Sequence, residues 1–429
     1  MLMRIQPNDI ANVLSSVINQ GLISDQDTSV VCYDQDRIRA RLKELSEMFP
    51  VKTLHAVAVK ANPLLSLLKD LVDQGAGLEC ASLCEVRLAL AAGCPPQRII
   101  FDSPVKTHSD LAFALDQGVH INVDNLTELD RIQDAIHTDS HLVPKTLGLR
   151  INPQVGQGRI PSTSVAADFS KFGVPLGEYR SHIVTRFLQL PWLNTLHCHI
   201  GSQGCTLEQL TGAVGQLLDV AMEIESKAGE QRVTHLDIGG GLPAPYSQEQ
   251  ESLPTAEDYV KALKWDYPEL FGKKYTLMTE FGRYIHANAA FAATRVEYVK
   301  IQEDQRLALV HLGADMFLRK CYQPDFWQHE LCVFAPNGQE KSAPALAYNI
   351  GGPLCFAGDF LARNIRLPEL EPGDWLGIRD AGAYTLSMWS RYNSRPMPLV
   401  LAYSTRDDEL VLSPVKPRET FEQVLSFWS

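Results

Sequence analysis

Lys60 stands where a short apolar run meets a turn, a position in which a lysine can do covalent chemistry. The run His55–Val59 precedes it, and Ala61-Asn62-Pro63 follows it. An amine at the end of a buried strand is partly desolvated, which favours its neutral form and lets it attack a carbonyl carbon. The alternative is a lysine that extends its ammonium group to solvent, which is the commoner situation for a lysine taken alone. The residues at the ends of other apolar runs decide between these interpretations.

Further groups that can do chemistry stand in or directly after such runs. They are Glu79, Arg150, His199, the triplet Gly239–Gly241, Glu280 and Arg283. An aldehyde cofactor needs a lysine for its Schiff base, and a phosphate needs backbone N–H groups that glycines allow it to approach. A pyridine nitrogen needs a carboxylate that keeps it protonated, and a planar side chain stacks on an aromatic ring. The set therefore indicates a phosphorylated pyridine aldehyde as the cofactor.

Each of these residues also has an ordinary explanation. A glycine triplet after a strand is usually a turn, and Glu280 and Arg283 can form a simple ion pair. A histidine between apolar neighbours, such as His199, is more often a satisfied core residue. Because all of these explanations would have to hold together at several strand ends, we favour the cofactor site.

The elements that must position these residues are apolar runs separated by segments with helical periodicity. The runs are Leu54–Val59, Leu78–Cys80, Arg98–Phe101, Val119–Val123, Thr146–Ile151, Thr195–Ile200, Val233–Ile238 and Tyr275–Glu280, and helical segments include Leu83–Ala92, Ser109–Gln117, Asn125–Ala135 and Glu208–Ala228. The runs lack strict alternation, as expected for parallel strands covered on both faces. This repetition predicts a (β/α)8 barrel with its reactive residues at the carboxyl ends of the strands. An open doubly wound sheet is the alternative, but its phosphate fingerprint is absent after the first strand.

The pattern of apolar residues changes after residue 286. Strand-like segments separated by Pro, Gly and Asp turns replace the helical periodicity. They are Ala293–Ile301, Leu307–Leu312, Pro344–Ile350, Asp374–Ile378, Met397–Ala402 and Glu409–Ser413, with Thr28–Tyr33 as a further candidate strand of the same unit. We therefore expect a barrel over residues 36–285 and a mostly β domain built from residues 1–35 and 286–429.

The composition is that of a globular enzyme. The chain has 429 residues, of which 45% are hydrophobic and 21% charged, so it is long enough for two domains. Its net charge of -12 argues against nucleic acid or a membrane surface as a partner. No signal peptide or membrane-spanning run is evident, and the nine cysteines lack the paired spacing of a metal site or a disulfide framework. We therefore expect a cytoplasmic enzyme without a metal ion.

Several short motifs occur together in a specific order. They are Ala58-Val-Lys-Ala-Asn62, Glu79-Cys-Ala-Ser82, Ser170-Lys-Phe-Gly173, His199-Ile-Gly-Ser202, Asp237-Ile-Gly-Gly-Gly241, Glu280-Phe-Gly-Arg283, Gly352-Pro-Leu-Cys355 with Asp359, and Gly382-Ala-Tyr384. As an ordered set they resemble the fold-type III, pyridoxal-phosphate-dependent decarboxylases of ornithine, diaminopimelate and arginine, and the resemblance extends over nearly the whole chain. The segment Ser387–Pro396 is more similar to the diaminopimelate branch than to the ornithine branch.

The resemblance implies pyridoxal 5'-phosphate as the cofactor and gives each residue a role. Lys60 would hold the cofactor covalently, Glu280 would pair with the pyridine nitrogen, and His199 would stack on the ring. The phosphate would be bound by Ser202, Gly239–Gly241, Arg283 and Tyr384, and Glu79, Arg150 and Gly282 would lie near the cofactor. An amino acid would lose CO2 by way of an external aldimine and a quinonoid.

The same resemblance assigns Cys355 as the acid that returns a proton to the α-carbon. In this family that cysteine comes from the second subunit, so a homodimer with shared active sites is implied. Diaminopimelate decarboxylases usually carry glutamate after this cysteine, whereas Phe356 stands here, and the stretch Arg319–Tyr322 departs from the family's Arg-Pro-x-Leu-Tyr segment. We therefore expect a different amino acid, or a conjugated or carrier-bound derivative, as the substrate. Its predicted contacts are Arg319, Tyr322, Cys355, Phe356, Asp359 and Tyr384.

Three other functions stay open at this point. The first is true meso-diaminopimelate decarboxylation. The second is a fold-type III racemase, which shares the barrel and the lysine but lacks the segment with Cys355 and Asp359 and needs a tyrosine base. The third is a regulatory homologue without activity, but such proteins lose cofactor residues, and all of those named above are present.

Overall fold

The computed structural model describes residues 4–342 and 344–429, and it divides into two compact units. The barrel unit comprises Arg39–Pro243 and Leu253–Ile285. The sheet unit comprises the described residues of Met1–Ile38, Ala244–Ser252 and His286–Ser429. The short segment 244–252 thus belongs to the sheet unit although the chain on both sides of it belongs to the barrel unit.

Parallel strands close into a barrel in the first unit. They are β2 Leu54–Ala58, β3 Gly77–Cys80, β4 Ile99–Asp102, β5 His120–Val123, β6 Leu147–Asn152, β8 Thr195–His197, β9 His235–Asp237 and β10 Thr276–Thr279. Their order is β5-β4-β3-β2-β10-β9-β8-β6, pairing of β5 with β6 closes the ring, and β7 Val174–Pro175 extends β6. Nearly every strand residue is buried, because side chains fill the interior and helices cover the outside. The predicted (β/α)8 barrel is confirmed.

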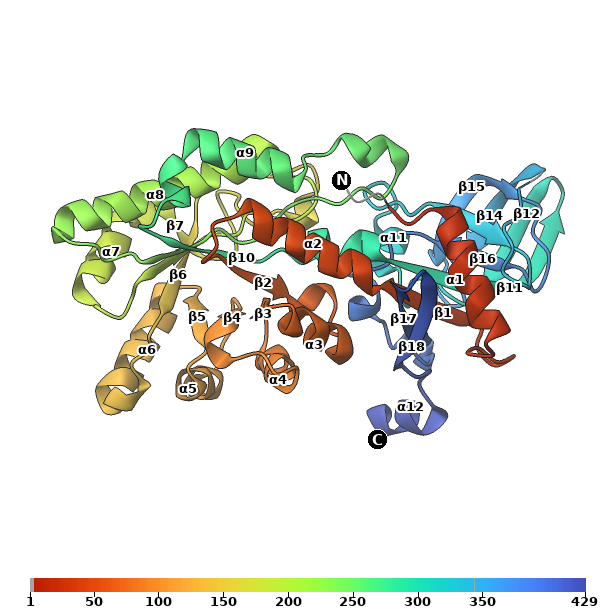
Figure 1. Ribbon diagram of the computed structural model, residues 1–429, viewed down its shortest axis with the longest axis horizontal. Helices are drawn as coiled ribbons and strands as arrows, with labels where there is room; N and C mark the ends of the chain where they lie inside the picture. The colour runs from red at the N-terminus through yellow and green to blue at the C-terminus, as the bar shows by residue number, and fades with distance from the viewer. Residues whose placement is uncertain (1–3, 343) are drawn as a thin grey trace. The chain divides into compact units, whose positions relative to one another are not determined.

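Helices surround these strands, and Figure 1 shows α4, α5 and α6 on one side of them and α7, α8 and α9 on the other. The helices are α2 Gln35–Met48, α3 Leu65–Asp73, α4 Leu83–Ala91, α5 His108–Gln117, α6 Leu126–Thr138, α7 Leu176–Gln189, α8 Leu207–Ala228, α9 Ala256–Asp266 and α10 Arg283–His286. Polar caps begin several of them: the side chains of Ser82, Thr107, Asn125, Thr206 and Thr255 each accept a backbone N–H from the first turn. These caps fix where each helix starts after its strand.

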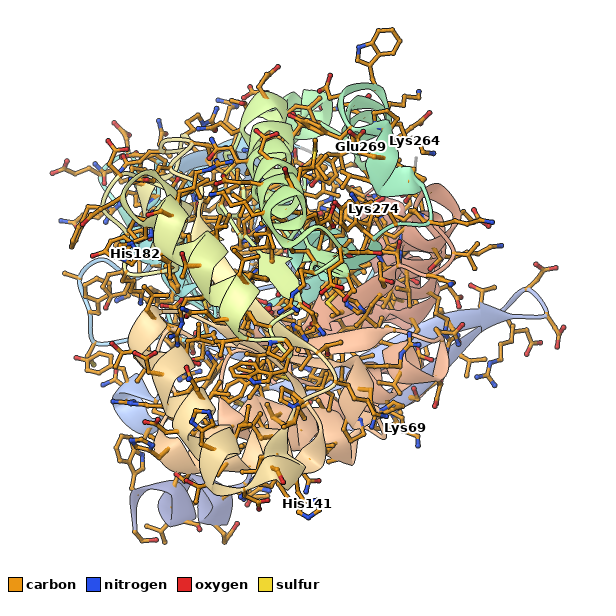
Figure 2. The ribbon with its side chains drawn as sticks, turned by 90° about the vertical axis from the view of Figure 1, so that its left-hand side faces the viewer. Lys69, His141, His182, Lys264, Glu269 and Lys274 are labelled. Carbon is orange, nitrogen blue, oxygen red and sulfur yellow. The ribbon has the colours of Figure 1, made fainter. Side chains whose placement is uncertain are left out.

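Charged and polar side chains cover the outer helix faces. Lys69 on α3, His182 on α7 and Lys264 on α9 are exposed, and Figure 2 marks them among the side chains at the surface. Within the part of the chain that the structure describes, no helix combines the length and the apolar character needed to cross a membrane.

A mixed sheet forms the core of the second unit. Its strands are β1 Ser29–Asp34, β11 Ala290–Gln302, β12 Gln305–Val310, β13 Leu331–Phe334, β14 Ala345–Gly351, β15 Phe360–Pro368, β16 Trp375–Ile378, β17 Leu399–Arg406 and β18 Glu409–Lys416. The order is β15-β14-β12-β11-β1-β17-β18, with β16 pairing both β11 and β13. Helices α1 Pro7–Asn19, α11 Leu318–Tyr322 and α12 Phe421–Trp428 complete the unit.

The N-terminal strand joins the C-terminal strands, as predicted for Thr28–Tyr33. β1 is antiparallel to β11 and parallel to β17, and its residues Val30, Val31 and Cys32 are completely buried. β13 and β15 were not predicted from the sequence. β15 is half-exposed and carries arginines and an asparagine, so it lacks the apolar pattern of a core strand. β13 is apolar but only four residues long.

Candidate active site

Lys60 lies in a single 3₁₀ turn, η1 Val59–Ala61, directly after β2. Its Nζ donates to both carboxylate oxygens of Glu79 on β3, each at 2.7 Å. The Glu79 side chain is completely buried, whereas that of Lys60 is 37% exposed. Burial raises the pKa of Glu79 to about 7, although the Lys60 cation opposes the increase. The pair therefore places a proton acceptor with a near-neutral pKa beside a reachable amine.

Arg150 on β6 is held on two sides. Its Nη1 donates to Oδ2 of Asp102, the last residue of β4, at 2.8 Å, and its guanidinium lies 4.6 Å from the ring centre of Phe172. Both members of the ion pair are buried. Burial by itself would raise the pKa of Asp102, but the Arg150 cation beside it lowers that pKa below its ordinary value. Arg150 is thus a fixed cation inside the barrel mouth.

His199 and the glycine triplet are packed against each other. The Gly240 N–H donates to Nδ1 of His199 at 3.0 Å, so this nitrogen carries no proton. Burial, with Arg150 and Lys60 nearby, lowers the pKa of His199 and keeps the imidazole neutral. A Cβ at Gly239, whose φ is +63°, would lie 2.5 Å from the Cys198 carbonyl oxygen. The strand ends can approach this closely only because glycine is present.

The glycine triplet also presents the backbone N–H of Gly241 as a possible donor to a ligand. The Gly239 N–H donates to Oδ1 of Asp237 at 3.0 Å, and that of Gly240 is taken by His199. Among the described residues, none accepts the N–H of Gly241. A Cβ at Gly240 would lie 2.5 Å from the Glu280 carbonyl oxygen, so the cradle has no room for a side chain. An anionic group would fit against this backbone.

Glu280 follows β10 directly and is 4% exposed. Its N–H donates to the Gly239 carbonyl at 2.8 Å, which fixes the backbone. Its Oε1 is buried and has no hydrogen-bond partner among the described residues. Burial raises the pKa of Glu280, and the carboxylates of Glu79 and Asp102 raise it further. A buried acceptor without a donor is costly, so this oxygen fits a bound ligand with an N–H group, such as a protonated pyridine nitrogen.

Ser202 and Arg283 meet near the same strand ends. Nε of Arg283 donates to Oγ of Ser202 at 3.0 Å, and Arg283 is 2% exposed. Gly282 lies between Glu280 and Arg283 in the chain. A hydroxyl group beside a guanidinium is a common arrangement for binding phosphate oxygens. The predicted barrel residues are therefore brought together at the carboxyl ends of the strands.

Sequence reasoning did not assign a role to the polar residues beneath this surface. Asp102 and His197 end β4 and β8, and Asp237 ends β9. Burial raises the pKa of Asp237 to about 7, and the nearby Glu280 carboxylate contributes to the increase. The signal in the sequence was a charged or polar residue as the last position of an apolar run, which marked Glu280 but was not applied to these three residues.

The remaining predicted residues belong to the sheet unit. Cys355 is exposed on a loop whose backbone is fixed, because its N–H donates to Oδ1 of Asn393 at 2.8 Å and its carbonyl accepts from the Tyr392 hydroxyl at 2.9 Å. Asp359 is buried, and its two oxygens accept the N–H groups of Ala314 and Leu354 at 2.6 and 2.7 Å. Asp359 therefore holds the loop together through both oxygens of its carboxylate.

Aromatic rings occupy the predicted substrate positions of this unit. Phe356 stacks on Tyr322 with ring centres 4.8 Å apart and planes inclined by 14°. The guanidinium of Arg319 lies 4.6 Å from the ring centre of Tyr384 and 4.9 Å from that of Trp327. The residues of these two groups are aromatic or cationic, and neither group contains an acidic side chain.

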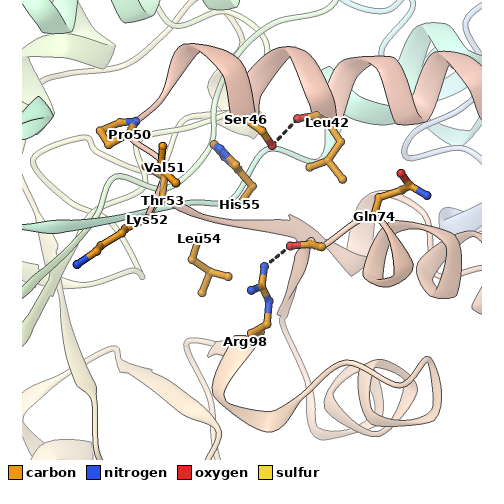
Figure 3. Close-up of a pocket in the computed structure, with 11 residues that line it drawn as sticks. Leu42, Ser46, Pro50, Val51, Lys52, Thr53, Leu54, His55, Gln74 and Arg98 are labelled. Atoms are coloured by element: carbon orange, nitrogen blue, oxygen red, sulfur yellow. Dashed lines mark hydrogen bonds between the residues drawn. The ribbon is translucent and has the colours of Figure 1, made fainter.

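A cavity of about 360 Å³ occurs at the opposite ends of the barrel strands. It is lined by residues that precede or begin β2 and β4, among them Lys52, His55 and Arg98. Figure 3 shows the Arg98 guanidinium bonded to the backbone before β3, where it meets the Gly75 carbonyl. Because Lys60 lies at the other end of β2, this cavity is not part of the candidate active site.

Comparison with known proteins gives a consistent result. The family described as pyridoxal-dependent decarboxylase, pyridoxal binding domain, matches residues 35–287. A diaminopimelate decarboxylase of Pseudomonas aeruginosa is 35% identical over 372 residues, which cover 86% of this chain and 86% of that protein. A diaminopimelate decarboxylase of Methanothermobacter thermautotrophicus is 32% identical and covers 98% of this chain and 96% of its own.

Solved structures agree with these relatives. A crystal structure of diaminopimelate decarboxylase from Helicobacter pylori, complexed with L-lysine, superposes with a TM-score of 0.83 at 29% identity. The match covers 96% of this chain and 99% of that one.

Proposed function

Because the chain belongs to the pyridoxal-dependent decarboxylases, we propose that it removes the α-carboxylate of an amino acid or of an amino-acid derivative. The observation that carries this proposal is the buried, unpartnered Oε1 of Glu280 at the same strand ends as the Lys60 amine. Oε1 of Glu280 can accept a hydrogen bond from a protonated pyridine nitrogen, and the Lys60 amine can form a Schiff base with an aldehyde.

Pyridoxal phosphate fits the residues that are present. Lys60 would hold its aldehyde carbon, Oε1 of Glu280 would accept from its ring nitrogen, and the neutral His199 would stack on its ring. Its phosphate would be met by the Gly241 N–H, Ser202 and Arg283, with Tyr384 as the predicted further donor. When bound, the cofactor supplies the electron sink that makes loss of CO2 possible.

The chain's own residues then handle protons and orientation. Glu79, with a pKa of about 7, takes the proton that the Lys60 ammonium must lose before its amine can react. Arg150 and Asp102 would stay paired, so that a fixed cation remains beside the cofactor. The exposed thiol of Cys355 would return a proton to the α-carbon, on a loop fixed by Tyr392 and Asn393.

We further propose a homodimer in which Cys355 serves the barrel of the second copy. Mixing a Lys60→Ala variant with a Cys355→Ala variant tests this arrangement. Hybrid dimers would recover decarboxylation that neither variant shows alone. Absence of recovery in a mixture shown to exchange subunits would contradict the shared site.

The first candidate substrate is meso-diaminopimelate, which the similarity to diaminopimelate decarboxylases over most of the chain supports. The second is a different amino acid or a conjugated one, which Phe356 supports. A phenyl ring stacked on Tyr322 cannot neutralise a distal ammonium group as a carboxylate does. The first candidate therefore has the support of overall similarity, and the second has the support of one loop.

A panel of amino acids, scored by CO2 release, separates the two candidates. Rapid turnover of meso-diaminopimelate by the unaltered chain would establish the first. Weak turnover that improves in Phe356→Glu, with a matched Phe356→Leu control that does not improve, would establish the second. Interconversion of enantiomers without CO2 would indicate a racemase, and absence of a borohydride-reducible absorbance at Lys60 would indicate a non-catalytic homologue.

A further inference from the structure

Cys355 is held by one neighbouring segment of the sheet unit, on both sides of its Cα atom. Its N–H donates to Oδ1 of Asn393 at 2.8 Å, and its carbonyl oxygen accepts the Tyr392 hydroxyl at 2.9 Å. One contact holds the peptide group before the Cα atom, and the other holds the peptide group after it. Because peptide groups are planar, the two contacts together set the direction in which the Cys355 side chain leaves the loop.

The segment that makes these contacts needs support from elsewhere in the molecule. Tyr392 is 51% exposed, and Asn393 and Ser394 are also exposed. The φ angle is +59° at Asn393 and +54° at Ser394. Residues with a side chain adopt this left-handed conformation at a cost, and they keep it only where surrounding contacts maintain it. Two such residues in succession at the surface therefore indicate an anchor.

The anchor is Glu419, whose side chain is 8% exposed. Its Oε2 and Oε1 accept Nη1 and Nη2 of Arg391 at 2.5 and 2.7 Å, and Oε2 also accepts the Met397 N–H at 3.1 Å. The Glu419 N–H donates to the Met397 carbonyl oxygen at 3.1 Å. Paired hydrogen bonds between a guanidinium and a carboxylate are strong and fix the geometry of both groups. Glu419 therefore ties together both ends of segment 391–397.

The helix that follows Glu419 fixes this ion pair in turn. Thr420 is the N-cap of α12, and its side chain accepts the Gln423 N–H while the Gln423 side chain accepts the Thr420 N–H. The ring centre of Phe427 on the same helix lies 4.6 Å from the guanidinium carbon of Arg391. The start of α12 thus sets where Glu419 stands, and its last turn packs on Arg391.

We propose that Glu419 and Arg391 are positioning residues for Cys355, and that they act through Tyr392 and Asn393. Neither residue contacts Cys355 itself. The ion pair keeps segment 391–397 in its left-handed turn, and the turn holds the two peptide groups beside Cys355. This coupling is a property of the sheet unit and does not depend on the proposed function.

The consequence for the reaction does rest on the proposed function, in which Cys355 returns a proton to the α-carbon. A proton donor must lie within hydrogen-bond distance of the atom that it protonates. Loss of the ion pair should therefore misdirect the thiol and slow turnover. Cofactor binding should not change, because the residues that would hold the cofactor covalently and at its ring belong to the barrel unit.

Hydrogen–deuterium exchange of the cofactor-free full chain measures the hold on Cys355. Mass spectrometry of a peptide covering residues 353–357 follows its N–H. Asn393→Gly and Asn393→Asp form a matched pair, because both residues tolerate a positive φ but only aspartate keeps an oxygen that accepts this N–H. One amide should exchange about tenfold faster in Asn393→Gly and at the unaltered rate in Asn393→Asp.

Glu419→Ala tests the coupling. The same amide should again exchange about tenfold faster, and Glu419→Ala combined with Asn393→Gly should be no faster than Asn393→Gly alone, because both changes remove one restraint. Arg418→Ala is the control, since Arg418 is the neighbouring residue but contacts Gln26 and Asp27 instead. If Glu419→Ala does not fold, Arg391→Lys replaces it, because lysine keeps the charge but loses the paired contact.

An exchange rate in Glu419→Ala, or in Arg391→Lys, that does not exceed the rate in Arg418→Ala would overturn the coupling. So would additive effects of Glu419→Ala and Asn393→Gly, because they would show two independent restraints.

Turnover tests the consequence for the reaction. Glu419→Ala and Asn393→Gly should lower kcat about tenfold with unchanged KM and unchanged affinity for pyridoxal phosphate, and Asn393→Asp should keep nearly the full kcat. An unchanged kcat in Asn393→Gly, or a change in KM alone, would overturn the positioning role. If the unaltered chain released CO2 from no amino acid, the proposed function would fail, and the exchange rates would still decide whether the coupling exists.

Discussion

The cofactor-free barrel should become less stable as pH rises, because Glu79 then ionises in a buried site. Glu79→Gln should not show this decrease, because glutamine does not ionise. The carboxyl group is completely buried, and its pKa is raised from 4.5 to about 7. A group whose pKa is raised in the folded state contributes stability below its unfolded pKa and loses it as pH rises through the folded pKa. The relevant window is therefore pH 4.5 to about 7.

The size of the effect follows from that change in pKa. It corresponds to roughly 3 kcal/mol for a single buried group. For a unit of this length, such a difference changes the unfolding midpoint by about 6–12 °C. Relative to the unaltered chain, Glu79→Gln should therefore gain stability between pH 5 and pH 8, and the gain should approach this size at the upper end.

Thermal unfolding of both cofactor-free proteins, followed by calorimetry at several pH values, measures the effect. Glu47→Gln on α2 is a suitable control, because Glu47 is 67% exposed and only 3.7 Å from Lys43 in a surface pair. The difference in unfolding midpoint between Glu47→Gln and the unaltered chain should not change with pH in this way. A difference between Glu79→Gln and the unaltered chain that is constant with pH, or that favours the unaltered chain at pH 8, would refute the reasoning.

Three further substitutions address the remaining parts of the site. Glu280→Ala should lower kcat by about 10²–10³ with little change in KM, because it removes an interaction made as charge develops on the ring, and equal loss in both constants would count against that role. Gly240→Ala places a Cβ 2.5 Å from the Glu280 carbonyl oxygen and should weaken pyridoxal phosphate binding by about 10–100-fold, measured by fluorescence titration. Cys355→Ser should lower the rate of product formation by about 10²-fold while cofactor binding is unaffected, and a Cys355→Ser variant with unchanged turnover would count against Cys355 as the proton donor.

The barrel could be predicted because its strands bury both faces. Runs such as Leu54–Val59 and Thr195–Ile200 are rich in apolar residues without the strict alternation of a half-exposed strand, and segments with helical periodicity separate them. Lys60 and Glu280 were predicted as site residues because a charged residue that ends an apolar run is conspicuous in the sequence. β15 was missed because its exposed face carries polar residues, and β13 was missed although its four residues are apolar.

The cluster of Asp102, His197 and Glu280 could not be predicted from spacing. Asp102, His197 and Glu280 are far apart in the sequence, and only closure of the barrel brings their side chains together. The motif around Asp359 marked it as a residue near the substrate, which stays a prediction. No sequence pattern revealed that its two oxygens accept backbone N–H groups of neighbouring loops.

The place of β1 in its sheet has a consequence for biosynthesis. This strand leaves the ribosome early, yet both of its neighbours, β11 and β17, follow the last barrel strand in the chain. Val30, Val31 and Cys32 must therefore wait, with their apolar side chains and strand edges uncovered, until the whole barrel has been translated. We expect nascent chains that stop before β11 to aggregate or to be held by chaperones, whereas chains that extend beyond β17 should fold freely.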